Sequence, residues 1–257
     1  MDFSIIVTAF QRANLLRCHF QSLLKQTKNF EYEILVLNDG LEDDTKSVCE
    51  QFSHLLPIRY IFTGQRNTNG IHWRVPGFAI NIGIKQAIGK SIIITCAEMY
   101  LLNNMLMDYQ SILAGNNKAI VITGGLDDRV GTISQKIEQQ NGEGIQIEVD
   151  KRVGIFPLHT KFPFFMGINR EQVIKIGGYD EDFTGYAYDD GDFVHRLENF
   201  NCHFITLPYK VLHLYHKRLA YSDPEVKVKV AYNEKLYRER AENIQANQGR
   251  EWGVYNV

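Results

Sequence analysis

The first hundred residues alternate between short apolar runs and longer amphipathic stretches. Unbroken apolar runs predict buried strands at residues 3–10, 32–39, 57–64 and 91–95. Between them, apolar residues at helical spacing predict helices at residues 13–26, 43–52 and 77–89, with Pro76 starting the last one and Gly89 ending it. Strands and helices that alternate through short connections indicate a mostly parallel α/β sheet with both faces covered by helices.

The second half of the chain is less regular. In chain order we expect a helix at 102–113, a strand at 118–125, a helix at 170–183 that ends at Gly177-Gly178, a helix at 190–200 and a short strand at 203–208. Residues 126–160 are polar and poorly periodic, so they are interpreted as a loop that can include a hairpin. Residues 224–257 begin as a polar helix and end in an aromatic segment. We predict one domain, with residues 1–218 as its body and 219–257 as a C-terminal helix and tail packed on it.

Composition narrows the class of protein. The 257 residues are 44% hydrophobic and 23% charged, which is typical of a globular protein, and the net charge of −2 gives no basic field for nucleic acid. The four cysteines show no Cys-x-x-Cys spacing and are interpreted as reduced, which favours a cytoplasmic protein. No apolar run approaches the roughly 20 residues of a membrane-spanning helix, and the N-terminus lacks the features of a signal peptide.

Polar side chains follow each predicted strand of the first half. They lie at residues 8–12, 38–40, 63–64 and 96–99. Because ligands of such sheets bind outside the carboxyl ends of the strands, these four segments predict one shared site.

Three blocks of this sequence resemble family 2 glycosyltransferases with the GT-A fold. They are 4-SIIVTAFQRANLLRCHFQSLLKQT-27 with 33-EILVLNDGLEDDT-45, then 76-PGFAINIGIKQAIGKSIIIT-95, and finally 177-GGYDEDFTGYAYDDGDFVHRL-197. Their order and spacing cover most of residues 3 to 218. The resemblance implies a GT-A fold and the transfer of a sugar from a nucleotide-diphosphate donor, usually with a divalent metal.

The resemblance assigns Asp39 to the donor nucleotide. A carboxylate at a strand end can accept the N3–H of a uracil ring, which favours UDP, although GDP and dTDP stay open. Thr8, Phe10 and Arg12 follow the first strand and would frame the base and the phosphates. The alternative is an ordinary loop in which Asp39 caps the next helix, a role that Asp43 or Asp44 already fills.

The stretch 91-SIIITCAEMYLL-102 departs from the family pattern. The family places Asp-x-Asp here to bind the ribose and, through Mg²⁺ or Mn²⁺, the diphosphate, whereas this chain has Cys96, Ala97 and Glu98. A thiolate prefers softer metals than these. Either Glu98 alone anchors the metal and Cys96 packs near the ribose, or the site no longer uses metal or no longer works.

The stretch 211-VLHLYHKR-218 supplies the second metal candidate. The family's third ligand is a histidine after the acidic block, which matches His216 best and His213 second. The two histidines are expected on one face of a helix or together in a turn, and a structural role for either stays open. Lys217 is expected to help neutralise the leaving diphosphate or to be a surface charge.

The stretch 188-YDDGDFVHRL-197 resembles the family's Glu-Asp motif. The resemblance makes Asp190 the general base that takes the proton of the acceptor hydroxyl and Asp189 the residue that orients the acceptor. Acids at a helix start are also favoured by the helix dipole alone. Trp73 is expected to stack on a sugar, or to fill the core. Arg74 is expected at the diphosphate, and Asn81 is grouped with the donor-binding residues.

These observations predict an inverting glycosyltransferase that uses Mn²⁺ or Mg²⁺, with a glycan or glycoconjugate as the acceptor. Lipid-linked sugars, proteins and modified nucleobases stay open as acceptors, as does the oligomeric state. A nucleotidyltransferase is disfavoured because Ala-Phe-Gln-Arg stands where it needs a Gly-rich loop and a lysine. A dinucleotide dehydrogenase is disfavoured because no G-x-G-x-x-G follows a strand. The alternative from another class is a non-catalytic carbohydrate- or nucleotide-binding protein that retains the fold, which Cys96 supports.

Overall fold

The computed structural model describes residues 1–257 except residues 41, 65–74, 141–146, 159–160, 219–222 and 256–257. Its first half is the predicted alternation of strands and helices. The elements are β1 (Phe3–Ala9), α1 (Ala13–Leu24), β2 (Tyr32–Asn38), α2 (Thr45–Phe52), β3 (Ile58–Phe62), α3 (Gly77–Gln86) and β4 (Ser91–Cys96). β1 pairs in parallel with β2 and with β4, and β2 pairs in parallel with β3. The predicted parallel α/β sheet is therefore confirmed, with element ends that differ from the prediction by at most three residues.

The second half adds strands of both directions. Its elements are β5 (Met99–Leu101), α4 (Leu106–Gly115), β6 (Ala119–Asp128), α5 (Thr132–Gln140), the 3-10 turn η1 (Lys151–Val153), β7 (Ile155–Leu158), β8 (Phe165–Asn169), α6 (Arg170–Lys175), α7 (Asp189–Asn199), β9 (His203–His213) and α8 (Pro224–Glu239). Across the described residues the sheet order is β3-β2-β1-β4-β8-β6-β9-β5, with β7 paired to β6. β6 and β9 run with the first group of strands, and β5, β7 and β8 run against it. β8 lies antiparallel to both β4 and β6 and joins the two halves of the sheet.

The described part of residues 126–160 is more regular than the predicted loop, and it contains the antiparallel strand pair that the prediction allowed. β6 continues to Asp128, and β7 returns antiparallel beside it. α5 follows because the Asp128 carboxylate accepts hydrogen bonds from the backbone N–H groups of Gly131, Ile133 and Ser134 at 2.8–3.0 Å. One buried carboxylate thus supplies the partners that the first N–H groups of a helix lack.

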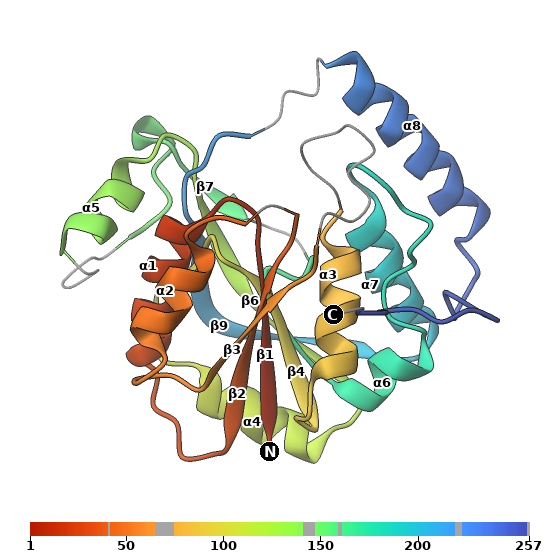
Figure 1. Cartoon of the computed structure of the whole chain (residues 1–257), viewed down its shortest axis with the longest axis horizontal. Helices are drawn as coiled ribbons and strands as arrows, with labels where there is room; N and C mark the ends of the chain where they lie inside the picture. Colours follow the sequence, from red (N-terminus) through yellow and green to blue (C-terminus); the bar gives the residue numbers. More distant parts are fainter. Residues whose placement is uncertain (41, 65–74, 141–146, 159–160, 219–222, 256–257) are drawn as a thin grey trace.

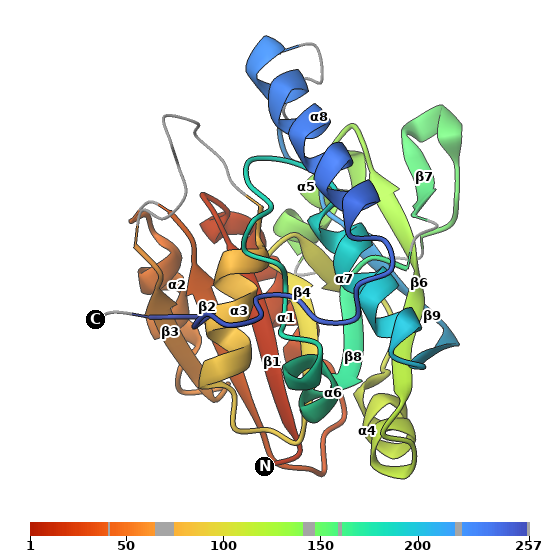
Figure 2. The same ribbon diagram turned by 90° about the vertical axis from the view of Figure 1, so that its right-hand side faces the viewer.

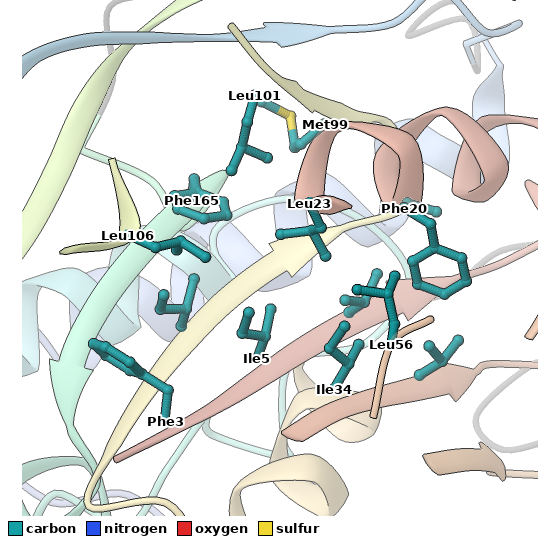
Figure 3. Close-up of a cluster of buried hydrophobic side chains, with 14 of the residues drawn as sticks. Phe3, Ile5, Phe20, Leu23, Ile34, Leu56, Met99, Leu101, Leu106 and Phe165 are labelled. Atoms are coloured by element: carbon teal, nitrogen blue, oxygen red, sulfur yellow. The ribbon is translucent and has the colours of Figure 1, made fainter. Parts of the chain in front are cut away.

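Helices cover both faces of the sheet (Figure 1), and buried apolar side chains form one layer on each face. One layer packs α1, α2 and α4 against the strands and includes Phe20, Leu23 and Leu106, which Figure 3 shows around Ile5 and Ile34. The other layer packs α3, α6 and α7 against the opposite face. The carboxyl ends of β1, β2 and β4 meet at one edge of this sandwich, drawn at the top of Figure 1.

The C-terminal segment packs back onto this body. α8 lies beside α7, and the residues after it run across α3 (Figure 2). Lys85 of α3 lies over the Trp252 ring at 4.0 Å, and Arg240 forms ion pairs with Asp180 and Asp182. In the part of the chain that is described, no helix is both long enough and apolar enough to cross a membrane.

Candidate active site

A cavity of about 200 Å³ lies at the carboxyl ends of β1, β2 and β4. Its lining gathers residues that the sequence predicted to share a site: Thr8, Phe10, Asp39, Cys96, Glu98 and His213. These residues are up to about two hundred positions apart in the chain, and the parallel register brings them together because Thr8 pairs with Cys96 and Ala9 with Asn38. The predicted convergence of strand ends is therefore present in the structure.

Asp39 lies directly after β2 and is 5% exposed. Its backbone N–H donates to the carbonyl of Ala9 at 2.8 Å, and its Oδ1 accepts a hydrogen bond from the Thr63 hydroxyl at 2.7 Å. The cap of the next helix is supplied by Asp43, whose Oδ1 accepts from the Thr45 N–H at 3.0 Å. Asp39 therefore faces the cavity and does not serve as the cap of α2.

Cys96, Ala97 and Glu98 form the tight connection between β4 and β5. The Ala97 N–H donates to the carbonyl of Thr8 at 2.9 Å, which holds this connection against β1. Burial, and then the neighbouring Glu98, raise the pKa of the Cys96 thiol well above its ordinary value. Cys96 is therefore a neutral thiol at physiological pH, and a thiol is a poor ligand for a hard cation.

Arg12 bridges Glu98 and His216. Its Nε lies 3.1 Å from Oε1 of Glu98, and its Nη2 lies 3.0 Å from Nδ1 of His216. Burial lowers the pKa of His216, and Arg12 lowers it further against the opposing charge of Glu98. His216 is therefore neutral near pH 7, and in the tautomer that leaves Nδ1 unprotonated this nitrogen accepts a hydrogen bond from the guanidinium.

His213 lies on a strand, which corrects the prediction that both histidines share a helix face or a turn. It is the last residue of β9, and its Nδ1 lies 3.2 Å from Oδ1 of Asp127. Burial would raise the pKa of Asp127, but hydrogen bonds from His213, Arg218 and Arg129 lower it well below its ordinary range. When Nδ1–H of His213 donates a hydrogen bond to the anionic Asp127, the Nε2 lone pair of His213 is left for a ligand. This arrangement is common among metal-binding histidines.

The residues present offer a limited fit to a divalent cation. Within the described residues no group of three or more His, Cys, Asp or Glu side chains is arranged to hold a metal ion. Glu98 and His213 nevertheless line the same cavity, and carboxylate oxygen and imidazole nitrogen both suit Mn²⁺. An ion held by this pair would need further ligands from the donor diphosphate.

A second, larger cavity of about 1010 Å³ adjoins the first, and Pro76 lines both. Asp189 and Asp190, the first residues of α7, line it. The Tyr179 hydroxyl donates to Oδ1 of Asp190 at 2.9 Å. Burial raises the pKa of Asp190 to about 6 although the Tyr179 bond opposes the shift, and burial together with Asp190 raises the pKa of Asp189 well above its ordinary value. With a pKa of about 6, Asp190 is mostly a carboxylate near pH 7.

The loop before α7 holds an unfavourable backbone conformation. Ala187 and Tyr188 have φ of 68° and 73°, in the left-handed region that non-glycine residues rarely adopt. Asn233 of α8 holds this loop, because its Nδ2 donates at 2.9 Å to the carbonyls of Thr184, Tyr186 and Ala187. Hydrogen bonds from α8 therefore hold the loop that leads into Asp189 and Asp190 at the start of α7.

Several predicted residues do not join the two cavities. Asn81 is fully buried, and its amide bonds to the backbone of Tyr179 and to Glu181, so it ties α3 to residues 179–181 and lines neither cavity. Lys217 is exposed. Trp73 and Arg74 lie outside the described residues.

Three residues of the site went unassigned in the sequence. Tyr179 belongs to the quoted 177-GGYDEDF-183 block, but its partner Asp190 becomes visible only in three dimensions. Asp127 follows an apolar strand, the same signal that identified Asp39, and was missed because the strand was ended at residue 125. Asn233 lies in a polar helix and carries no sequence signal.

Comparisons with known proteins agree with this architecture. A model described as Glycosyl transferase family 2 matches residues 4–177, and one described as N-terminal domain of galactosyltransferase matches residues 155–217. Chondroitin synthase of Escherichia coli is 24% identical over 230 residues, which are 78% of this chain and 33% of that protein. This chain therefore spans about a third of the length of that relative.

Solved structures show the same fold. The structure of S. aureus TarS 1-349 in complex with UDP has a TM-score of 0.58 at 18% identity and covers 94% of this chain and 70% of that one. The structure of GalNAc-T7 with UDP, GalNAc and Mn²⁺ has a TM-score of 0.61 at 14% identity and covers 93% of this chain and 50% of that one. The predicted GT-A fold is confirmed by these neighbours. With a family model matched over residues 4–177 of 257, the chain belongs to glycosyl transferase family 2.

Proposed function

We propose that this protein is an inverting glycosyltransferase that moves a sugar from a UDP-sugar to an acceptor hydroxyl, with Asp190 as the general base. The observation that carries the proposal is the placement of Asp190 in a cavity that meets, at Pro76, the cavity containing Asp39 and Glu98. The transferase activities and the UDP in the names of related proteins support the same reading.

Asp39 supports UDP as the carrier. Its buried carboxylate is fixed by Thr63 at the end of β2, and a carboxylate has lone pairs for more than one donor. We expect a uracil N3–H to donate to this carboxylate, which lines the smaller cavity. Arg12 forms an ion pair with Glu98 of the same cavity, and we expect its guanidinium to contact the diphosphate.

Asp190 supports direct displacement. It takes the proton of the acceptor hydroxyl as that oxygen bonds to the anomeric carbon, while the bond from that carbon to the diphosphate oxygen breaks and UDP leaves with the electron pair. A base with a pKa of about 6 is mostly ionised at neutral pH and still strong enough to accept a proton. Asp189, whose pKa burial and Asp190 raise above its ordinary value, would hydrogen-bond and orient the acceptor.

Glu98 and His213 are the pair we propose as protein ligands of Mn²⁺ or Mg²⁺. When bound, such an ion would stabilise negative charge on the departing diphosphate. Asp127 would fix the orientation of His213. We propose His213 rather than His216 as the histidine ligand, because Nδ1 of His216 already contacts Arg12.

The test is a thermal-shift panel of UDP, GDP, dTDP and UDP-sugars, each with and without Mn²⁺ and Mg²⁺, followed by UDP-release assays. A ligand at 100 times its dissociation constant stabilises a protein by about 2.7 kcal/mol, which is readily measured. Asp190→Asn is expected to abolish transfer and keep the UDP response, whereas the exposed Asp44→Asn should change neither. Transfer that persists in Asp190→Asn rules out this base.

The second candidate is a non-catalytic protein that binds nucleotide or carbohydrate. Cys96 favours it, because a neutral thiol stands where the family has an acid. Binding of UDP with no release of UDP from any UDP-sugar, with or without metal, would select this candidate.

A further inference from the structure

The larger cavity is a groove between two helices. Segments that line it are residues 161–162, residues 185–191 before and at the start of α7, the α7 residues 194, 195 and 198, and Val230 and Tyr237 of α8. Its volume of about 1010 Å³ is at the upper end of the range for small-molecule sites. It therefore has room for an acceptor longer than a single sugar ring.

Aromatic rings form much of its wall. They belong to Phe162, Tyr186, Tyr188 and Tyr237. The rings of Tyr188 and Tyr237 lie 5.6 Å apart at 41°, so they present a tilted pair rather than a closed stack. Rings of this kind offer flat apolar faces with a polar edge, which matches ligands that have apolar faces and hydroxyl rims.

The charges in the groove are predominantly acidic. Asp189, Asp190 and Glu198 line it, and among the described lining residues Lys161 is the one lysine or arginine. Lys161 is already paired with Glu198 at 2.7 Å, at the exposed rim. The inner part near the acid pair has no described lysine or arginine in its lining, so a carboxylate, sulfate or phosphate on a ligand would meet uncompensated negative charge there.

One buried oxygen in the groove lacks a partner. Asp189 is 5% exposed, and no described residue makes a hydrogen bond to its Oδ2. Buried polar atoms of proteins are rarely left in this state unless a ligand or water completes them. A hydroxyl group, which both donates and accepts, would satisfy this oxygen.

We propose that the groove between α7 and α8 binds an uncharged oligosaccharide acceptor, with sugar rings against Tyr188 and Tyr237 and a hydroxyl on Asp189. The proposal rests on the proposed function in one respect, because the acceptor hydroxyl beside Asp189 is the one that Asp190 deprotonates. It selects neutral glycans from the acceptors that the sequence left open and excludes polyanionic glycans.

The experiment is binding of the full chain to a glycan array that carries neutral and acidic oligosaccharides, with titration calorimetry on the best binders. We expect neutral glycans to bind, and their sulfated, phosphorylated or uronic-acid counterparts to bind at least tenfold more weakly. Preference for acidic glycans, or no glycan binding in the presence of saturating UDP, would overturn the inference.

Variants of α8 test the position of the ligand. Tyr237→Leu should weaken binding about 2- to 10-fold, the range expected for one lost aromatic contact, whereas Tyr237→Phe should retain it. The matched control is Tyr232→Leu on the same helix, because Tyr232 is 50% exposed and outside the groove. Equal effects of the Tyr237 and Tyr232 changes to leucine would show that the groove is not where the glycan binds.

The failure of this inference and that of the proposed function can be told apart. UDP binding with turnover only on acidic acceptors would leave the transferase intact and reject the neutral-glycan groove. Neutral-glycan binding that depends on Tyr237, in a protein that neither binds UDP nor releases it, would keep the groove and reject the transferase.

Discussion

The hydroxyl of Tyr179 donates a hydrogen bond of 2.9 Å to the carboxylate of Asp190. The tyrosine is fully buried, and its ring stacks on Phe193 with centroids 4.2 Å apart. The bond favours the charged form of a carboxylate whose pKa burial has raised to about 6. Tyr179 thereby lowers the pH above which the carboxyl group of Asp190 is ionised.

Tyr179→Phe should move the pH profile of transfer. A base works when it is deprotonated, so activity is expected to rise as the pH rises through about 6. Loss of the bond raises the pKa of Asp190 and shifts this acidic limb to higher pH, with the largest loss of kcat/KM below pH 7. Tyr109→Phe is the control, because that buried hydroxyl donates to the carbonyl of Phe165 in the other apolar layer. If the acidic limb of the pH profile stays at the same pH in Tyr179→Phe, the proposed role of Tyr179 is wrong.

Asn233→Ala should loosen the loop that carries the acid pair. It removes hydrogen bonds to three carbonyl groups and leaves strained residues 187 and 188 without support. We expect a loss of about 2–4 kcal/mol in the free energy of unfolding, from several buried hydrogen bonds of roughly 1 kcal/mol each, and a fall in kcat. Urea unfolding and steady-state kinetics measure the two effects. Exposed Asn243→Ala should be neutral, and a stable Asn233→Ala protein with full kcat would speak against the role of this asparagine.

Arg12→Ala should separate the metal response from the nucleotide response. With the ion pair at 3.1 Å removed, Glu98 is free to bind a cation, so Mn²⁺ alone should raise the melting temperature more than it does in the parent protein. The shift given by UDP should shrink, because a cation for the diphosphate is lost. Arg17→Ala, on the same helix and over the Phe52 ring, is the control. A Mn²⁺ response that stays the same would mean that Arg12 does not compete for Glu98.

Cys96→Asp should restore an acid to the strand end. If the natural site is a weakened metal site, a second carboxylate beside Glu98 should make UDP binding and transfer more dependent on Mn²⁺. Cys96→Ser keeps a neutral side chain of similar size and should leave the metal dependence as it is. If Cys96→Asp and Cys96→Ser show the same dependence of UDP binding and transfer on Mn²⁺ concentration, residue 96 plays no part in metal binding.

The parallel half of the fold and its site could be predicted because their signals are local. Buried parallel strands give unbroken apolar runs such as 91–95, and ligands gather at their carboxyl ends, so Thr8, Asp39 and Glu98 were found together. Strand β8 gave no such signal, because its five residues are fixed by pairing with β4 and β6 from distant parts of the chain.

Strand β9 shows a different physical reason for a missed element. The sequence-based strand stops at Pro208, since proline cannot donate to a sheet. In the structure the pairing with β6 passes from Thr123–Leu207 to Gly124–Lys210, so Pro208 and Tyr209 bulge out and the strand resumes. That continuation carries His213 to the cavity, which explains why this histidine was expected on a helix or turn.

Hydrogen bonds between the C-terminal segment and residues 181–187 also affect the order in which the protein folds during translation. The partners of Asn233 lie 46 to 49 positions earlier in the chain, and Glu181 and Asp182 are held by Asn247 and Arg250. During translation the parallel strands emerge long before these fastenings exist. We therefore expect the nascent chain to form the part of the smaller cavity built by β1, β2 and β4 early. It should hold Asp189 and Asp190 in their final positions only after residue 250 has left the ribosome, so that transferase activity would be among the last properties to appear.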